Sequence, residues 1–431
     1  MPESIERSRY GCNLHGAIQT LSAITGVVPI VHSTPGCGIQ NYIANGAGGN
    51  SSGYLAGFAV PNSNVYEKQV IFGGTSRLRE QIKNTVKVVN GDLYVTLSGC
   101  EAEMVGDDII SMTQEIVEQG ETAIYYKAPG FKGDQHIGYE GVIDAILSQL
   151  PEVTNMVSEK EDGLVNLLGI IPKQDLYWQG NLNEIERILK HLGVKVNKLL
   201  GYQQTVDHWK KIPSAQLNVV VSKWGVNLAK KLEQSYGTPF IYIEDAGLEL
   251  NSIEDFVKKV ANQLQIDPEK TKKYLELETD RVIDALSQIS DYYFDYDFQR
   301  QAVIVGDEST VLRYGRFLSK QFGMEILAAI ITDFTGEATK QIIPEEFKIF
   351  AQETYFTKDS REIDKIIENA DAEIIFGSGL ENKIAKKQQI PNYIISYPAF
   401  GKVIISKTDI GYQGAVNVIE ELSSFLIKHQ L

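Results

Sequence analysis

The chain has 431 residues, of which 43% are hydrophobic and 23% are charged, and its formal net charge is −15 at pH 7. This length exceeds one ordinary core and predicts two or three domains, while the composition is typical of a soluble globular protein. The acidic balance excludes a protein whose main partner is nucleic acid, because such proteins need a basic face.

The chain carries no sign of export or of membrane insertion. The first twelve residues contain acidic and basic side chains without an apolar core, which is unlike a secretory signal. No apolar run approaches the ~20 residues that span a bilayer. We therefore expect a cytoplasmic protein. Its three cysteines are an odd number, so in a reducing compartment they are free, catalytic or bound to metal.

The first clear strand–helix–strand pattern begins near residue 92. Residues 92–100 form a short apolar strand that ends in a small-residue turn, and residues 107–120 have apolar side chains at helical spacing. Residues 122–129 are the next strand. This pattern is the building block of a parallel sheet.

The same pattern recurs along the rest of the chain. Its later strands are predicted at residues 164–172, 194–201, 217–225, 238–245, 301–309, 324–333, 372–379 and 391–398. Apolar strands that end in Gly/Ser loops are typical of doubly wound sheets with helices on both faces. We predict an α/β protein of three doubly wound, Rossmann-like domains: residues 1–160, 161–298 and 299–431.

The phosphate-binding signatures of such folds are missing. No G-x-G-x-x-G opens a helix, and no G-x-x-x-x-G-K-[ST] occurs in the chain. The turn 306–310, "GDEST", could receive an anion at a helix N-terminus, but more often such a turn is only a helix cap. If the reaction uses ATP, we expect another protein to bind it.

All three cysteines have glycine neighbours and lie in the first quarter of the chain. They are Cys12, Cys37 and Cys100, and the last lies at the end of a predicted strand, where open parallel sheets bind ligands. Glycine lets a bulky iron–sulfur core approach, and free N–H groups can point at its sulfides. The alternative is three buried, inert thiols.

The spacing and surroundings of the cysteines resemble component 1 of nitrogenase and its nitrogenase-like relatives. Cys37 follows Cys12 by 25 residues (37 − 12), and Cys100 follows Cys37 by 63 (100 − 37). The stretches that carry the resemblance are "VPIVHSTPGCG", "SGCEAEMVGDDI", "APGFKGDQHIGYEG" and the C-terminal "PNYIISYPAFGKVIISKTDIGYQGAVNVIEEL". It extends over essentially the whole chain.

The resemblance implies that Cys12, Cys37 and Cys100 bind one iron–sulfur cluster, of the eight-iron P-cluster type or a 4Fe-4S cluster, shared with a partner subunit. That partner is a homologous alpha-type subunit, and a heterotetramer is implied. An ATP-hydrolysing iron–sulfur reductase protein supplies the electrons. No residue of this chain is expected to be catalytic.

Neighbouring residues of these motifs receive structural interpretations. Glu103 and Gly106 are expected to shape the loop and the partner surface, as is Asp107, although acidic side chains at a helix N-terminus explain Asp107 and Asp108 equally well. His32 is either a packed histidine or a group that acts near the cluster.

Two features favour a beta-type subunit. Ser222 occupies the position at which the resemblance places a cofactor-binding cysteine in alpha-type subunits, and no histidine lies between His208 and His429. Gly130 stands where conventional beta subunits have a serine that binds the oxidised eight-iron cluster, which makes a four-iron cluster credible.

We therefore expect a beta-like electron-transfer subunit of a nitrogenase or nitrogenase-like reductase. The substrate stays open among dinitrogen, methylthio compounds and tetrapyrroles. The alternative is a scaffold on which the catalytic cofactor is assembled, because assembly proteins belong to the same family.

Overall fold

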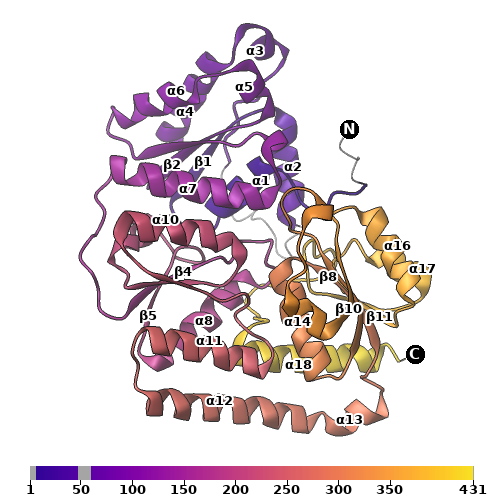
Figure 1. Ribbon diagram of the computed structural model, residues 1–431. Coiled ribbons are helices and arrows are strands. Elements are labelled where there is room, and N and C mark those ends of the chain that lie inside the picture. Colours follow the sequence, from indigo (N-terminus) through magenta and orange to yellow (C-terminus); the bar gives the residue numbers. More distant parts are fainter. Residues whose placement is uncertain (1–5, 47–59, 431) are drawn as a thin grey trace. The chain divides into compact units, whose positions relative to one another are not determined.

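The computed structural model describes residues 6–46 and 60–430, and in these residues the strands form three sheets. Each sheet contains parallel strand pairs (Figure 1). The predicted fold class, α/β with several Rossmann-like parallel sheets, is confirmed.

The first sheet has the strand order β1-β2-β3, and β1 and β2 are buried along their whole length. Its strands are β1 (Val27–His32), β2 (Leu93–Ser98) and β3 (Ala123–Lys127). The surrounding helices are α1 (Asn13–Leu21), α2 (Pro35–Gly46), α3 (Glu67–Phe72), α4 (Thr75–Val88), α5 (Cys100–Val105), α6 (Ile109–Val117), η1 (Gly130–Lys132) and α7 (Gln135–Val153). In Figure 1, α4 and α6 cover one face of this sheet, and α1 and α7 cover the other. Cover on both faces explains why the strands are continuously apolar.

The second sheet has the order β5-β4-β6-β7. Its strands are β4 (Leu164–Leu168), β5 (Lys195–Lys198), β6 (Leu217–Val220) and β7 (Phe240–Tyr242). The helices in this part of the sequence are α8 (Trp178–Leu192), α9 (Val206–Lys210), η2 (Ile212–Ser214), η3 (Lys223–Gly225) and α10 (Val226–Tyr236). Buried amides connect adjacent strands: Asn166 donates to Asn218 at 2.8 Å, and Asn197 donates to Asn166 at 2.8 Å. Each amide thereby finds a partner inside the sheet.

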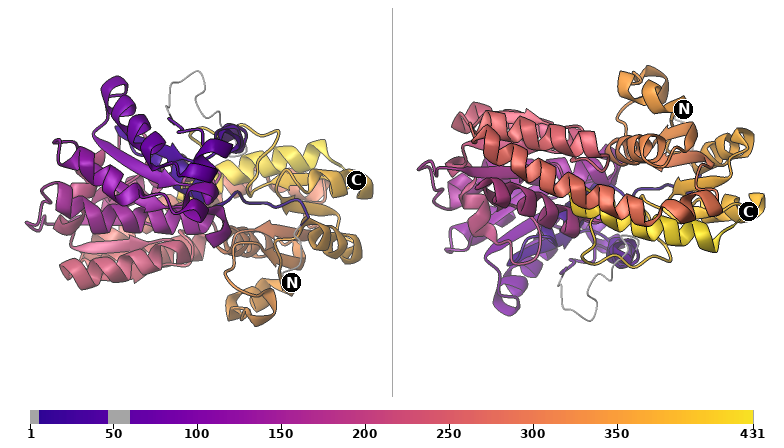
Figure 2. Two further views of the ribbon diagram at one scale, coloured as in Figure 1. Left: turned by 90° about the horizontal axis from the view of Figure 1, so that it is seen from above. Right: turned by 90° about the horizontal axis from the view of Figure 1, so that it is seen from below.

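The third sheet has the order β10-β9-β8-β11-β12, which is the Rossmann arrangement with a switch between β8 and β11. Its strands are β8 (Gln301–Gly306), β9 (Glu325–Ile331), β10 (Ala351–Phe356), β11 (Ile374–Gly377) and β12 (Asn392–Ile394). The helices from residue 250 onward are α11 (Leu250–Gln263), α12 (Pro268–Gln288), α13 (Ser290–Asp295), α14 (Glu308–Lys320), η4 (Ala338–Lys340), α15 (Glu345–Phe350), α16 (Ser360–Ala370), α17 (Asn382–Gln388) and α18 (Gly411–Lys428). The long helices α12 and α18 lie side by side (Figure 2).

By internal contacts the chain divides into two compact units. One contains Lys173–Lys195 and Ile241–Leu431 together with the N-terminal segment up to Arg9, and the other contains Tyr10–Pro172 and Val196–Phe240. The second unit holds all three cysteines. The three domain ranges predicted from the sequence stay a prediction. In the described residues, no helix combines the length and the apolar character needed to span a membrane.

Candidate functional site

Each cysteine lies at the beginning of a helix and has a glycine beside it in the sequence. Cys12 is the N-cap of α1, Cys37 is in the first turn of α2, and Cys100 is the first residue of α5. All three are free and partly exposed. Backbone N–H groups at a helix start can stabilise the negative charge of a group bound next to them.

The loop around Gly130 brings Cys12 and Cys100 together. Cys12 forms an antiparallel bridge with Asp134, which places it against this loop. The N–H of Gly130 donates to Cys100 Sγ at 3.1 Å. A Cβ atom at Gly130 would lie 3.3 Å from the Sγ atoms of both Cys12 and Cys100. The two sulfurs therefore flank a position where only glycine leaves space.

Two further glycines set the distance between α1, which begins next to Cys12, and α7. A Cβ atom at Gly16 would lie 2.0 Å from the carbonyl oxygen of Gln135, and one at Gly138 would lie 2.1 Å from that of Asn13. Backbone atoms cannot yield as a flexible side chain can. The close approach of the two helices thus fixes Cys12 relative to the Gly130 loop.

The third thiol, that of Cys37, has polar neighbours of its own. Ser33 lies within hydrogen-bond distance of two acceptors, Cys37 Sγ at 3.1 Å and Glu101 Oε2 at 3.2 Å. Burial raises the pKa of Cys37, whereas hydrogen bonds from Ser33 and Thr34 lower it. The thiol is the resting form, and a metal cation would favour the thiolate.

His15 is a site residue that the sequence interpretation missed. Its Nδ1 lies 3.3 Å from Cys12 Sγ, and its Nε2 lies 3.4 Å from the carbonyl oxygen of Cys37. One ring therefore contacts two of the three cysteine loops. The only signal in the sequence was a histidine three residues after Cys12 on a helix, where side chains meet.

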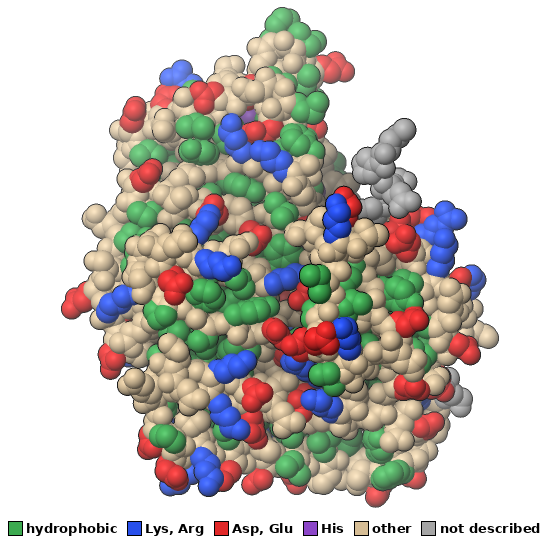
Figure 3. All heavy atoms as spheres, viewed as in Figure 1, with side chains coloured by type: hydrophobic (Ala, Val, Ile, Leu, Met, Phe, Trp, Pro, Cys, Tyr) green, Lys and Arg blue, Asp and Glu red, His purple; other side chains and the backbone are tan. Residues whose placement is uncertain are grey.

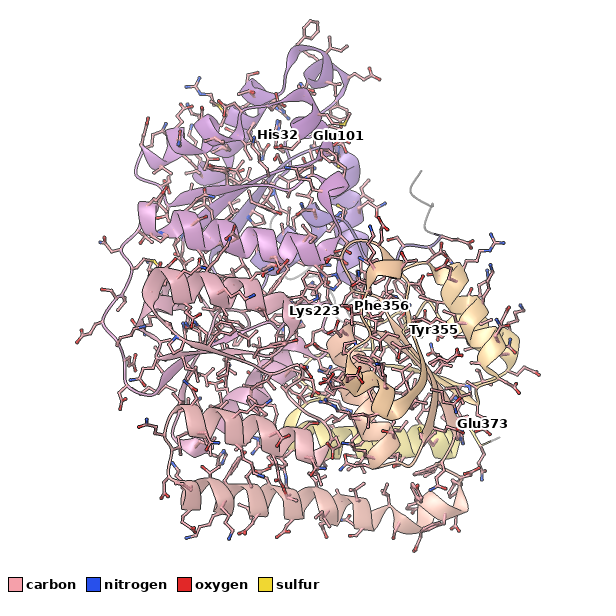
Figure 4. All side chains as sticks on the ribbon, in the orientation of Figure 1. His32, Glu101, Lys223, Tyr355, Phe356 and Glu373 are labelled. Atoms are coloured by element: carbon pink, nitrogen blue, oxygen red, sulfur yellow. The ribbon has the colours of Figure 1, made fainter. Side chains whose placement is uncertain are left out.

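His32 is a packed histidine that lies within the core of this unit. Its side chain is fully buried, with Nδ1 2.7 Å from Ser63 Oγ and Nε2 2.9 Å from Asp107 Oδ2. Burial lowers its pKa, and Asp107 opposes that shift. In the view of Figure 4, His32 lies near Glu101, the residue that follows Cys100. Both ring nitrogens are occupied, so the packed alternative holds.

The other residues of the cysteine motifs shape the loops. Glu103 accepts a hydrogen bond from Ser98 at 2.5 Å, and Gly106 ends α5 in the left-handed region with φ +81°. Asp108 caps α6 through the N–H of Ser111, as expected.

Asp107 serves a different helix from the one expected. Its carboxylate accepts from the N–H of Gly74 at 2.7 Å, at the start of α4, and also contacts His32. The turn "GDEST" is a helix cap as well, because Asp307 accepts from the N–H of Thr310 at 3.0 Å.

Apolar side chains are exposed near the cysteines. Ile39 on α2, Met104 on α5 and Phe131 on η1 are 62%, 78% and 62% exposed. Val70, Ile71 and Phe72 on α3 are also exposed. Figure 3 shows hydrophobic side chains at the end of the molecule where Figure 1 places α3. An exposed apolar patch of this kind marks an interaction site.

The side chains of Ser222 and His429 both contact other parts of the chain. Ser222 is buried after β6 and donates to the carbonyl oxygen of Gly169 at 2.5 Å. The His429 ring packs on Phe425, and its Nδ1 lies 2.9 Å from the Phe425 carbonyl oxygen.

No three His, Cys, Asp or Glu side chains in the described part of the chain are placed to hold a single metal ion. The cysteine loops are therefore not a preformed mononuclear site. A multi-iron cluster differs from a single metal ion, because its ligand sulfurs are spread around a larger core and can come from more than one chain.

Residues 12–427 match the family described as nitrogenase component 1 type oxidoreductase. The chain belongs to this family. The resemblance seen in the cysteine motifs is thereby confirmed, and the chain is a relative of oxidoreductase subunits.

Members with different printed functions are similar to the chain. It is 28% identical to a nitrogenase iron-molybdenum cofactor biosynthesis protein NifE of Clostridium pasteurianum, over 96% of this chain and 87% of the relative. It is 23% identical to a nitrogenase molybdenum-iron protein beta chain of Methanococcus maripaludis, over 96% and 93%. One of the subunits of the light-independent protochlorophyllide reductase of Prosthecochloris aestuarii is 22% identical, over 94% and 76%.

A solved structure of nitrogenase Cp1 at pH 6.5 superposes with a TM-score of 0.81 at 17% identity, covering 99% of this chain and 95% of the other. At that identity the similarity establishes the component 1 fold and nothing finer.

Proposed function

We propose that this chain is a beta-like subunit of a nitrogenase or nitrogenase-like reductase, and that Cys12, Cys37 and Cys100 hold an iron–sulfur cluster at its interface with a partner. The observation that carries the proposal is the grouping of three free thiols in one unit, each within hydrogen-bond distance of a polar group: His15 Nδ1 at Cys12, the Ser33 hydroxyl at Cys37 and the Gly130 N–H at Cys100. Inert core thiols need neither exposure nor donors.

The residues present fit such a cluster. Thiolates are the usual protein ligands of iron–sulfur clusters, and hydrogen bonds to their sulfurs tune the potential. Gly130 leaves open the space between Cys12 and Cys100 that a Cβ atom would fill. When bound, the cluster supplies one-electron transfer. The chain itself contributes the thiolates, their hydrogen bonds and a rigid frame, and none of its residues is proposed to act as an acid or base.

The ligand count implies a partner. Three thiolates cannot complete a four-iron or eight-iron site, so we propose that a homologous alpha-type subunit supplies the remaining ligands, in a heterotetramer. The exposed Ile39, Met104 and Phe131 beside the cysteines are suited to such an apolar contact.

We assign ATP use to another protein. The turn at Asp307 uses its own side chain to cap α14, and the chain lacks a phosphate-binding lysine loop. We propose that an ATP-hydrolysing iron–sulfur reductase protein docks on the cysteine-bearing unit and donates electrons there. Reduction of substrate by the complex then requires both that protein and ATP.

The second candidate function is a scaffold for assembly of the nitrogenase cofactor. It is favoured by the 28% identity to a protein named for cofactor biosynthesis. In this case the complex would hold a cofactor in transit and would reduce no substrate.

The decisive experiment is anaerobic co-purification of the chain with its partner subunit. Iron and sulfide are measured for the wild type and for single Cys→Ala variants at Cys12, Cys37 and Cys100. We expect each variant to lose iron, whereas Ser22→Ala, at the end of α1 outside the three loops, retains it. Full iron content in a triple Cys→Ala variant would refute the assignment.

The same preparation separates the two functions. Substrate reduction that stops when either the reductase protein or ATP is omitted supports the relay. Delivery of a metal cofactor to a cofactor-free component 1, without turnover, supports the scaffold.

A further inference from the structure

His15 occupies a place between two cysteine loops of the proposed cluster site. It lies in the first turn of α1, three residues after Cys12, and is 7% exposed. Its two ring nitrogens have different partners: Nδ1 faces the Sγ atom of Cys12, and Nε2 faces the carbonyl oxygen of Cys37. Both loops are thereby connected through a single buried side chain.

The chemistry of these two partners determines which nitrogen carries the hydrogen. A neutral imidazole has one N–H, so its two ring nitrogens, which face Cys12 Sγ and the Cys37 carbonyl oxygen, cannot both donate. While Cys12 is a thiol, its S–H can point at Nδ1, and Nε2–H can donate to the carbonyl. A thiolate that binds iron has no hydrogen, so Nδ1–H is the arrangement that supports it.

The other two sulfurs already have donors that suit a thiolate. The backbone N–H of Gly130 points at Cys100 at 3.1 Å, and the Ser33 hydroxyl lies 3.1 Å from Cys37 Sγ. His15 completes this set at Cys12. Hydrogen bonds to a charged acceptor are stronger than neutral ones, and they favour the more negative, reduced state of a cluster.

We propose that His15 is a positioning residue that donates a hydrogen bond from Nδ1 to the Cys12 thiolate and thereby raises the reduction potential of the cluster. The inference rests on the proposed function, because it requires a cluster at Cys12. It goes beyond ligand assignment, since it names a residue that sets the electron affinity of the site.

The test uses the anaerobically purified complex with its partner subunit. Three variants separate the two nitrogens: His15→Phe removes both, His15→Asn places an amide N–H near the Nδ1 position, and His15→Gln places one near the Nε2 position. The matched control is His208→Phe, because the Nδ1 atom of the His208 ring contacts Thr205 at the start of its own helix. Iron content and the midpoint potential, from a titration followed by electron paramagnetic resonance, are measured for each.

We expect the His15→Phe complex to have a more negative midpoint potential than the wild type. The Asn variant should recover most of the shift, the Gln variant should resemble Phe, and the His208 control should be unchanged. In the wild type, ¹⁵N-labelled histidine should couple weakly to the reduced cluster, and this coupling should vanish in the Phe variant.

An iron-loaded Phe variant with the wild-type potential would overturn the inference while leaving the cluster assignment intact. If the Phe variant holds no iron, the two amide variants decide: recovery by Asn alone supports the inference, and equal potentials in both overturn it. Loss of iron in all three variants also overturns it, because the role is then purely structural. A wild-type complex without iron refutes the proposed function itself.

Discussion

Replacing Gly130 by alanine tests whether the space between Cys12 and Cys100 is needed. In the structure the new methyl carbon would lie 3.0 Å from Cys12 Cβ and 3.3 Å from the Sγ atoms of Cys12 and Cys100. Favourable contacts between carbon atoms lie at roughly 3.5–4.0 Å, so the Cys12 loop must move by about half an ångström. That loop is held by the close approach of α1 and α7 at Gly16 and Gly138, and it cannot move freely.

Overpacking of this kind costs about 1–3 kcal/mol. If the methyl group displaces the sulfurs from their ligand positions, this cost weakens iron binding by about 5- to 150-fold, since 1.4 kcal/mol is roughly tenfold. Iron per complex should therefore fall to about one fifth or less at limiting iron. Iron analysis and the visible absorbance of the cluster measure this after anaerobic purification.

The matched control is Gly36→Ala, next to Cys37. Among the described residues, the one atom within 4 Å of a Cβ atom there is Thr34 Oγ1, at an ordinary 3.7 Å, and the backbone conformation of Gly36 is open to alanine. We expect normal iron content in this variant. If Gly130→Ala binds as much iron as Gly36→Ala, the open space at Gly130 has no role in the site and the reasoning is wrong.

Three further predictions concern the stability of the folded chain. Gly16→Ala should reduce the free energy of unfolding by about 3 kcal/mol and release iron, because its methyl group would lie 2.0 Å from the carbonyl oxygen of Gln135; urea unfolding and iron analysis measure both. Arg9→Ala should lower the free energy of unfolding by about 3–5 kcal/mol, because the buried Glu381 carboxylate loses the cation that lies 2.5 Å away. Adding Glu381→Gln should restore part of this loss, and urea unfolding measures both variants. Burial, aided by the charge of Asp409, raises the pKa of Asp175 from 3.8 to about 7, so the folded chain keeps a proton that the unfolded chain releases. Stability should fall as pH rises from about 4 to about 7, and Asp175→Asn should flatten that slope in melting temperature measured against pH.

The sequence predicted the later strands well because they are apolar and end in small-residue turns. It did not predict β1 as a strand, since Pro29 interrupts the run and removes a donor. In the structure β1 is an edge strand, where a proline is tolerated. The edge strand β10 was missed for another reason: its sequence "AQETYF" is polar and none of its residues is fully buried. Edge strands need less apolar character, so periodicity alone does not detect them.

The cysteines could be singled out in the sequence because glycine context and spacing are local properties, and their role as cluster ligands stays a prediction. The role of Asp107 could not be predicted in this way, because it caps α4, which begins 32 residues earlier at Thr75. A carboxylate before a helix is normally assigned to that helix, and here Asp108 takes that place. Only the folded chain shows which of two adjacent acids reaches the distant helix.

The three hydrogen-bond donors to the cysteine sulfurs differ in whether they can be recognised in the sequence and in how easily a substitution removes them. The donor to Cys100 is the backbone N–H of Gly130, which no substitution other than proline removes. The Ser33 hydroxyl has one hydrogen for two acceptors, Cys37 and Glu101, so its contribution depends on a second residue.

The proposed donor at Cys12 is the His15 side chain, so one substitution can remove or replace it. Such a substitution changes neither the backbone nor a second acceptor, as a change at Ser33 would at Glu101. Variation at His15 can therefore adjust the potential of the proposed cluster while the fold and ligand set stay constant. An electron relay depends on such adjustment, because its potential must lie between those of its donor and its acceptor. A scaffold that only holds a cofactor in transit has no comparable requirement. With the donor proposed at Cys12, each of the three thiols has a hydrogen-bond donor, which is a feature that the proposed relay function would use.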